Sequence, residues 1–155
     1  MDVKVIWDHG LSFAGTAGTG FSVTLGASAS VGGNDDGFRP MELIATGLAG
    51  CTAMDVISIL QKKRQDVVSF EVRVHTEQAA DYPKVFTSAV IEYIIKGHNV
   101  DEEAVRRSME LSAVRYCPAQ AMFAKIMPIQ LKYSIFEVEN DGENRLVKGG
   151  VLTPA

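Results

Sequence analysis

The chain has 155 residues and a net charge of −4, with 46% hydrophobic and 22% charged residues. This length suits one domain, and the composition is ordinary for a globular protein. The acidic net charge argues against a nucleic-acid-binding surface. A short basic run at 61–64 (QKKR) fits the solvated end of a helix. We therefore predict a single domain, 1–155, that does not bind nucleic acid.

Short β-rich segments punctuated by glycine open the chain. Residues 3–7 (VKVIW) and 20–25 (GFSVTL) alternate roughly between apolar and polar side chains, which predicts an N-terminal meander of short strands. The glycines of 15–20 (GTAGTG) have the wrong spacing for a phosphate-binding loop, so we predict a hairpin turn there. We expect no signal peptide, since no basic segment precedes an apolar run at the start.

A long helix is predicted at about 40–64, after a loop rich in glycine, asparagine and aspartate. Pro40 fits its first turn, where a missing N–H costs little. Residues spaced by three and four share one face of this helix: Ile44, Leu48, Cys51, Asp55 and Ile59. Gly47 and Gly50 are unusual, because glycine in a helix costs about 1 kcal/mol relative to alanine. Their presence predicts the close approach of a second backbone.

The apolar run at 41–60 is long enough to span a bilayer. Glu42 and Asp55 argue against that, since a carboxylate at the bilayer centre costs a few kcal/mol. We predict a buried helix in a cytoplasmic protein that does not enter a membrane and whose thiols are normally reduced.

The second half of the chain predicts strands and helices in a mixed order. The expected elements are strands at 67–77 and 85–97, a helix capped by Asn99 or Asp101, a short helix starting at Pro118, and a strand at 128–139. The tail, 140–155, is expected to be mobile or to depend on a partner. The order predicts the α+β class with an antiparallel sheet.

Two cysteines, Cys51 and Cys117, are the candidate reactive residues. Cys117 precedes Pro118 at the start of a helix, where backbone N–H groups and the helix dipole favour a thiolate; we therefore predict a lowered pKa for Cys117. Arg115 is close enough in sequence to help. Cys51 lies in the middle of a helix with Asp55 one turn on, so its thiolate needs a cation from elsewhere.

Other interpretations of the cysteines remain open. Both could be inert core thiols, because free cysteine is among the most buried residue types. A cysteine–histidine hydrolase is a further alternative, although nothing singles out a partner among His9, His75 and His98. The cysteines and histidines lack the spacing of metal ligands, so we expect no metal and no cofactor.

One combination of motifs is distinctive. Residues 39–56 (RPMELIATGLAGCTAMDV) are followed much later by 116–121 (YCPAQA), and 5–27 (VIWDHGLSFAGTAGTGFSVTLGA) precede both. In this order they resemble the family of osmotically induced protein C and organic hydroperoxide resistance protein (OsmC/Ohr), with the less characterised OsmC-like branch as the nearer match. The resemblance covers nearly the whole chain.

The resemblance implies an OsmC-like fold in an intertwined homodimer, with active sites at the subunit interface. It also implies a thiol peroxidase that acts on organic hydroperoxides in oxidative-stress defence. Cys51 matches the peroxidatic cysteine, which becomes a sulfenic acid, and Cys117 matches the resolving cysteine, which forms a disulfide with it. A small or lipoyl-linked dithiol would then reduce the disulfide.

The match departs from the family at the residues that activate the first cysteine. The family uses an arginine oriented by a glutamate directly after the proline, where this chain has Met41, with Glu42 next. Glu42 is nine positions from Cys51, which puts it on the opposite helical face. No arginine occurs before Arg39, so Arg39 is our candidate. The main alternative function is non-catalytic binding of a small apolar ligand in the same interface pocket, which would need no cation beside Cys51.

Overall fold

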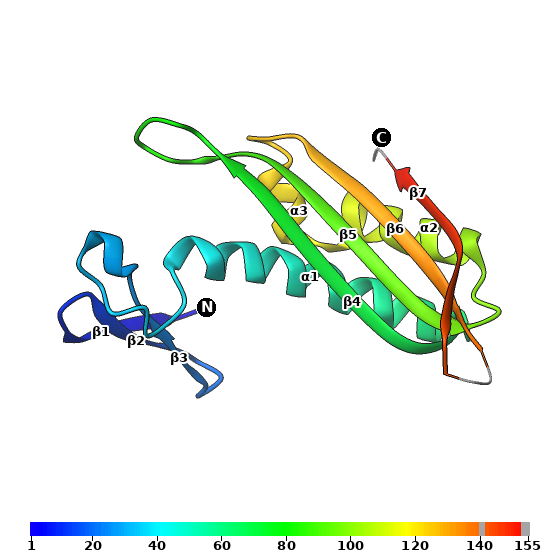
Figure 1. Ribbon diagram of the computed structural model, residues 1–155, viewed down its shortest axis with the longest axis horizontal. Coiled ribbons are helices and arrows are strands. Elements are labelled where there is room, and N and C mark those ends of the chain that lie inside the picture. The colour runs from blue at the N-terminus through cyan, green and yellow to red at the C-terminus, as the bar shows by residue number, and fades with distance from the viewer. Residues whose placement is uncertain (140–141, 153–155) are drawn as a thin grey trace. The chain divides into compact units, whose positions relative to one another are not determined.

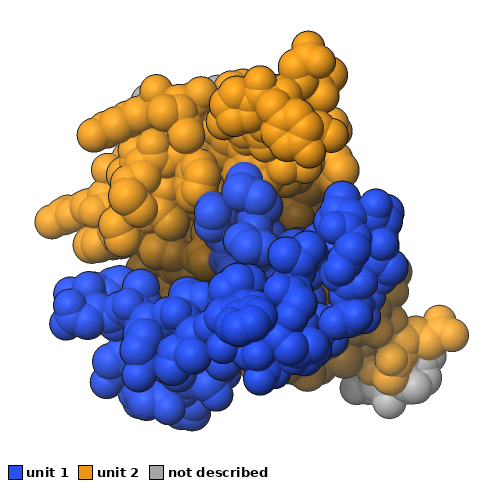
Figure 2. Space-filling view, turned by 90° about the vertical axis from the view of Figure 1, so that its left-hand side faces the viewer, with its two compact units in different colours: residues 1–46 blue, residues 47–155 orange. Residues whose placement is uncertain are grey.

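The computed structural model describes residues 1–139 and 142–152. The chain forms two compact units, Met1–Thr46 and Gly47–Ala155, which Figure 2 colours separately. The boundary falls within the long helix α1 (Pro40–Lys62). Each unit has its own sheet.

The smaller unit contains the predicted N-terminal meander. Strands β1 (Val3–His9), β2 (Ser12–Ala17) and β3 (Ser22–Leu25) form an antiparallel sheet in chain order, and a short 3₁₀ turn, η1 (Ala29–Val31), follows. The predicted turn at 15–20 is shorter than expected, because β2 continues to Ala17. Many apolar side chains of this unit are exposed, among them Val3, Val5, Ile6, Trp7 and Phe21.

The larger unit is built on a four-stranded sheet. Its strands lie in the order β4 (Asp66–Gln78), β5 (Phe86–His98), β6 (Ile129–Val138) and β7 (Asn144–Leu152). The sheet is antiparallel except that β5 and β6 are parallel. That pair is joined by a helical crossover, as parallel strands require. The crossover comprises α2 (Glu102–Leu111), the π-helical turn η2 (Ser112–Tyr116) and α3 (Pro118–Phe123) (Figure 1). The predicted α+β class is confirmed.

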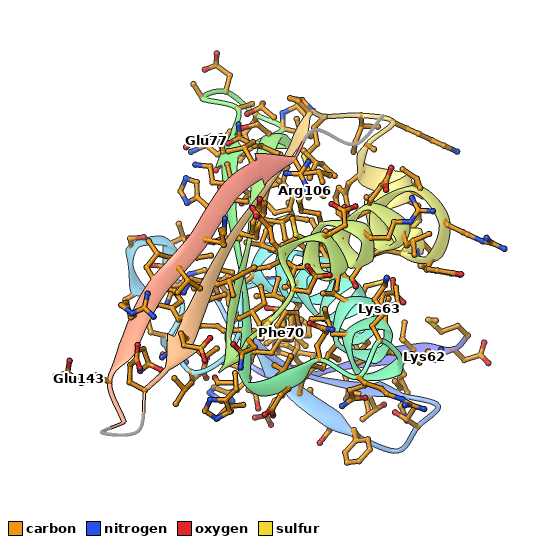
Figure 3. The ribbon with its side chains drawn as sticks, turned by 90° about the vertical axis from the view of Figure 1, so that its right-hand side faces the viewer. Lys62, Lys63, Phe70, Glu77, Arg106 and Glu143 are labelled. Atoms are coloured by element: carbon orange, nitrogen blue, oxygen red, sulfur yellow. The ribbon has the colours of Figure 1, made fainter. Side chains whose placement is uncertain are left out.

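The core lies between this sheet and the helices that cover one of its faces (Figure 3). From Ala89 to Gly97, every second residue of the central strand β5 is buried, as expected of a strand with one face on a core. Phe70 of β4 packs from the sheet against this core, where its ring stacks on Tyr93 with 6.5 Å between centroids. Asp101 caps α2 through both of its carboxylate oxygens, as one of the two predicted caps.

The tail was expected to be mobile or to depend on a partner, and mobility is wrong for the residues that the structure describes. Asn144–Leu152 form β7 and pair antiparallel with β6; residues 140–141 and 153–155 lie outside the described residues. Within β7, Gly150 lies where a neighbouring side chain approaches the backbone closely. A Cβ on Gly150 would lie 2.8 Å from the Tyr133 hydroxyl oxygen, so only glycine lets the Tyr133 ring pass.

The buried stripe of α1 also differs from the predicted one. Its most buried residues are Leu48, Thr52, Val56 and Leu60, so the helix turns the neighbours of Cys51 and Asp55 into the core. By length and composition α1 could cross a membrane. Instead, three of these residues belong to the hydrophobic core of the larger unit.

Candidate functional site

The larger unit brings the two cysteines together although they are 66 positions apart in sequence. Cys51 lies on α1 and is half-buried, whereas Cys117 is 2% exposed and precedes the first turn of α3. Both are free thiols, and the Cys51 side chain lies close enough to Cys117 to raise the pKa of its thiol. The pair therefore consists of one accessible and one sequestered sulfur that interact with each other.

Local structure holds Cys117 at two points. Its backbone N–H donates to the Ser112 carbonyl at 2.9 Å, which closes the π-helical turn. Its Sγ accepts from the Gln120 backbone N–H at 3.4 Å, so Cys117 is the N-cap of α3. Pro118 favours this geometry because its fixed φ suits the first helical position.

The predicted low pKa of Cys117 is wrong. Burial raises the pKa of the Cys117 thiol to about 12, with further contributions from the hydrogen bond with Cys51 and the charge of Asp55. The Gln120 N–H acts in the opposite direction but is outweighed. The sequence identified the helix start correctly, but desolvation dominates over the short helix α3. Cys117 therefore rests as a protonated thiol.

This raised pKa makes stability depend on pH. Between pH 9.0, the ordinary value, and about 12, the folded protein keeps a Cys117 proton that the unfolded chain has lost. The contribution of Cys117 to the free energy of unfolding is therefore fully present below pH 9.0 and is lost as the pH rises toward about 12. We expect Cys117 to lower the free energy of unfolding by on the order of 1–2 kcal/mol between about pH 8 and pH 10.5. Urea unfolding of reduced protein measures this.

The control for this prediction is Cys117→Ala. The variant should lose less stability over the same pH interval, because the Cys117 thiol is gone. Some loss should remain, because burial also raises the pKa of Tyr93 to about 12. An equal loss in both proteins would contradict the assignment.

A buried polar network lies beside the cysteine pair. We call it the Thr52 network; its members are Tyr93, Thr52, Ser112, Asp55 and Gln120. The Thr52 hydroxyl is at its centre, 2.6 Å from the Tyr93 hydroxyl and 2.9 Å from the Ser112 hydroxyl. Gln120 Nε2 donates to Thr52 at 2.8 Å, and Ser112 donates to Asp55 at 3.0 Å. Of its members only Asp55, half-buried on α1, is more than 2% exposed.

Sequence reasoning missed this network, except for Asp55. Threonine, serine and glutamine carry no motif signal when they stand alone, and their meeting depends on the crossover that brings η2 and α3 against α1. One available signal was position: Thr52 follows Cys51, and Ser112 and Gln120 lie five residues before and three after Cys117.

Arg39 lies in the smaller unit, where two carboxylates hold it. Its guanidinium is 2.7 Å from Asp35 Oδ1 and 3.3 Å from Glu42 Oε1. The Arg39 backbone N–H also donates to Glu42 at 3.0 Å, which fixes the start of α1. Glu42 lies nine positions from Cys51 on the helix, and its partner in the structure is Arg39. The chain thus has an arginine held by a glutamate, and this glutamate stands one position later than the glutamate of the family pattern.

Two arginines of the larger unit, Arg107 and Arg115, have partners of their own. Arg107 pairs with Glu110, and exposed Arg115 lies over the Tyr116 ring. The three histidines lie beside surface carboxylates, so these contacts give the hydrolase hypothesis no support: His9 with Asp8, His75 with Glu77 and His98 with Glu137. Within 1–139 and 142–152, no group of three or more His, Cys, Asp or Glu side chains is placed to hold a metal ion.

The α+β fold, the long helix α1 and the cysteine pair together are those expected of the OsmC-like class. The family described as OsmC-like protein matches residues 33–132, and the chain belongs to it. Among curated relatives, Protein YhfA of Escherichia coli K12 is 35% identical over 135 residues, which span 87% of this chain and 98% of that protein. The resemblance inferred from sequence is confirmed.

Solved structures share the fold. A hypothetical protein from Aquifex aeolicus is 24% identical with a TM-score of 0.78, over 89% of this chain and 97% of its own. An organic hydroperoxide resistance protein from Legionella pneumophila is 15% identical with a TM-score of 0.64, over 86% and 94% of the two chains.

Proposed function

We propose that this protein is a thiol peroxidase that reduces organic hydroperoxides in cytoplasmic oxidative-stress defence. The observation that carries the proposal is the contact between half-buried Cys51 and sequestered Cys117. Membership of the OsmC-like family and the fold shared with an organic hydroperoxide resistance protein support it.

The proposed cycle has three steps. The Cys51 thiolate attacks one peroxide oxygen, the O–O bond breaks, and the alkoxide takes a proton and leaves as the alcohol; Cys51 is oxidised to a sulfenic acid. The Cys117 sulfur then bonds to the Cys51 sulfur while the S–O bond breaks, and the Cys117 proton leaves with hydroxide as water. A small or lipoyl-linked dithiol reduces the disulfide and is itself oxidised.

Arg39 is the proposed cation for the Cys51 thiolate, from the same chain or from a partner. Its two carboxylate contacts hold the guanidinium in place and leave further N–H donors unused.

The proposed function is tested by mixing reduced protein with cumene hydroperoxide or with hydrogen peroxide. The loss of peroxide and the loss of free thiols are followed together. Preferential loss of the organic peroxide, with two thiols consumed per chain, is the expected result. If the protein consumes neither peroxide, the proposed peroxidase function is contradicted.

One observation favours a second candidate, the binding of a small apolar ligand. The smaller unit holds a pocket of about 340 Å³ with a mostly apolar lining, to which Val5, Val23, Leu25 and Leu43 contribute. An inactive protein in the peroxide assay that still bound an apolar fluorescent probe would favour this function.

We further propose that the chain acts as a single domain within a homodimer. The exposed apolar residues of the smaller unit support a partner surface. Gly47 and Gly50 also support it. An added Cβ at either position would meet nothing within 4 Å apart from its chain neighbours and the backbone of its own helix, so packing against other elements of the described chain does not explain these glycines.

Light scattering at micromolar concentration should therefore give about twice the chain mass of 16.8 kDa. Gly47→Ala separates the two states. It should stabilise an isolated chain by about 1 kcal/mol through helix propensity, but it should weaken a dimer whose backbones meet at that position. A wild-type mass of one chain would contradict the dimer.

A further inference from the structure

Two residues hold Cys117, and both reach the same hydroxyl group. Ser112 accepts the Cys117 N–H, and Gln120 donates its own N–H to Cys117 Sγ. The Ser112 hydroxyl and the Gln120 side-chain amide then meet at Thr52, at 2.9 and 2.8 Å. Thr52 is the neighbour of Cys51 on α1. The segment that carries one sulfur is therefore tied to the helical turn that carries the other.

The chemistry of the groups fixes the direction of these hydrogen bonds. Ser112 donates its one hydroxyl hydrogen to an Asp55 carboxylate oxygen, so that hydrogen is not available to Thr52. Thr52 must then donate to Ser112, and Tyr93 and Gln120 must both donate to Thr52. The Thr52 oxygen thus uses its single donor and both acceptor positions. One arrangement satisfies the whole network, which makes it rigid.

Asp55 also places the end of the network at the surface. It lines a pocket of about 350 Å³ with Met54, Ile59, Lys62 and Tyr116 among its other residues. The acceptor that directs the buried hydroxyls is therefore reached by solvent, while the hydroxyls and the Gln120 side chain are sealed. Among the described residues, no buried side-chain nitrogen or oxygen lacks a hydrogen-bond partner.

We propose that the Thr52 network positions Cys117 for the resolving step, with Thr52 as the hub and Asp55 as the acceptor that sets its direction. The role in peroxide turnover rests on the proposed function. The network acts on the second sulfur: it aligns Cys117 with the Cys51 sulfur, where the S–S bond forms. The first attack on the peroxide, by Cys51, does not depend on it.

A disulfide reagent separates the two steps without any peroxide. With 5,5′-dithiobis(2-nitrobenzoate), accessible Cys51 forms a mixed disulfide and releases one nitrothiobenzoate. Cys117 then attacks the Cys51 sulfur, forms the internal disulfide, and releases the second nitrothiobenzoate and its own proton. Stopped-flow absorbance resolves these as a first and a second phase, whose rates report Cys51 and Cys117 respectively.

Thr52→Val should leave the first phase unchanged and slow the second about tenfold or more, because a misplacement of about 1 Å can cost a hundredfold in rate. Thr52→Ser keeps the hydroxyl and should restore the second phase. Asp55→Ala should slow the second phase, whereas Asp55→Asn, which keeps an acceptor for Ser112 and removes the charge that raises the pKa of Cys117, should be no slower than wild type. Thr76→Val makes the same change on β4 and should alter neither phase.

Asp55→Ala keeps the test open if Thr52→Val does not fold, since Asp55 lies at the surface end. Unchanged second phases in the folded variants would overturn the proposal, as would equal slowing of both phases. With one equivalent of cumene hydroperoxide, Thr52→Val and Asp55→Ala should accumulate sulfenic acid, trapped by dimedone and detected by mass, whereas Thr52→Ser, Asp55→Asn and Thr76→Val should not. If wild type consumes no hydroperoxide but the second phase still responds, the peroxidase function falls and the positioning role stands.

Discussion

Hydroperoxide consumption should fall to background in Cys51→Ser, whereas Cys117→Ser should consume about one hydroperoxide per site and then stall. The reason is the unequal setting of the two sulfurs. Cys51 is half-buried, while Cys117 is 2% exposed and has a pKa raised to about 12, so it is a poor first nucleophile. Stopped-flow consumption of cumene hydroperoxide, with dimedone trapping, measures both results.

Two results would contradict this order. If Cys117→Ser loses the first turnover while Cys51→Ser keeps it, the roles are reversed. If both variants match wild type, the cysteines are core residues. An external dithiol is the matched control, because it should let Cys117→Ser turn over slowly and should not rescue Cys51→Ser.

Arg39→Met should slow the reaction of Cys51 with hydroperoxide and with iodoacetamide about tenfold or more at neutral pH, since a nearby cation favours the reactive thiolate. Methionine keeps the apolar stem and removes the charge. Glu42→Gln should have a smaller effect, because Asp35 still holds the guanidinium at 2.7 Å. The measurement is the rate of alkylation against pH.

Arg73→Met is the control, because Arg73 forms an exposed ion pair with Glu71 on β4. It should leave the alkylation profile unchanged. If Arg39→Met also leaves the profile unchanged, the activating cation is another residue, and Arg107 and Arg115 become the next variants to test.

The sequence predicted the elements with strong periodicity and missed those held by packing. The alternation at 67–77 and 85–97 predicted β4 and β5 within a residue or two at each end. β7 was missed because its glycines weaken the strand pattern, and the reason for Gly150 is a tyrosine on the neighbouring strand. Only the folded chain brings those two residues together.

The candidate site was predicted as Cys51, Cys117 and Arg39, without the buried polar network beside the cysteines. The position of Cys117 at a helix start was correct, yet its pKa shifts the other way because burial outweighs the helix terminus. Sequence spacing placed Glu42 on the helical face opposite Cys51 but did not predict its contact with Arg39. Desolvation and tertiary contacts decide such cases, and neither follows from spacing alone.

The π-helical turn before Cys117 has a consequence for sequence comparison. It makes the spacing from Ser112 to Cys117 part of the site, because one residue more or fewer would rotate the serine hydroxyl away from Thr52. The site can thus be written as a string: C-T-x-x-D on the long helix, then S-x₄-C-P-x-Q. Homologues that share both halves at this spacing are expected to share the positioning device. Those that keep only the cysteines must align their second sulfur by other means.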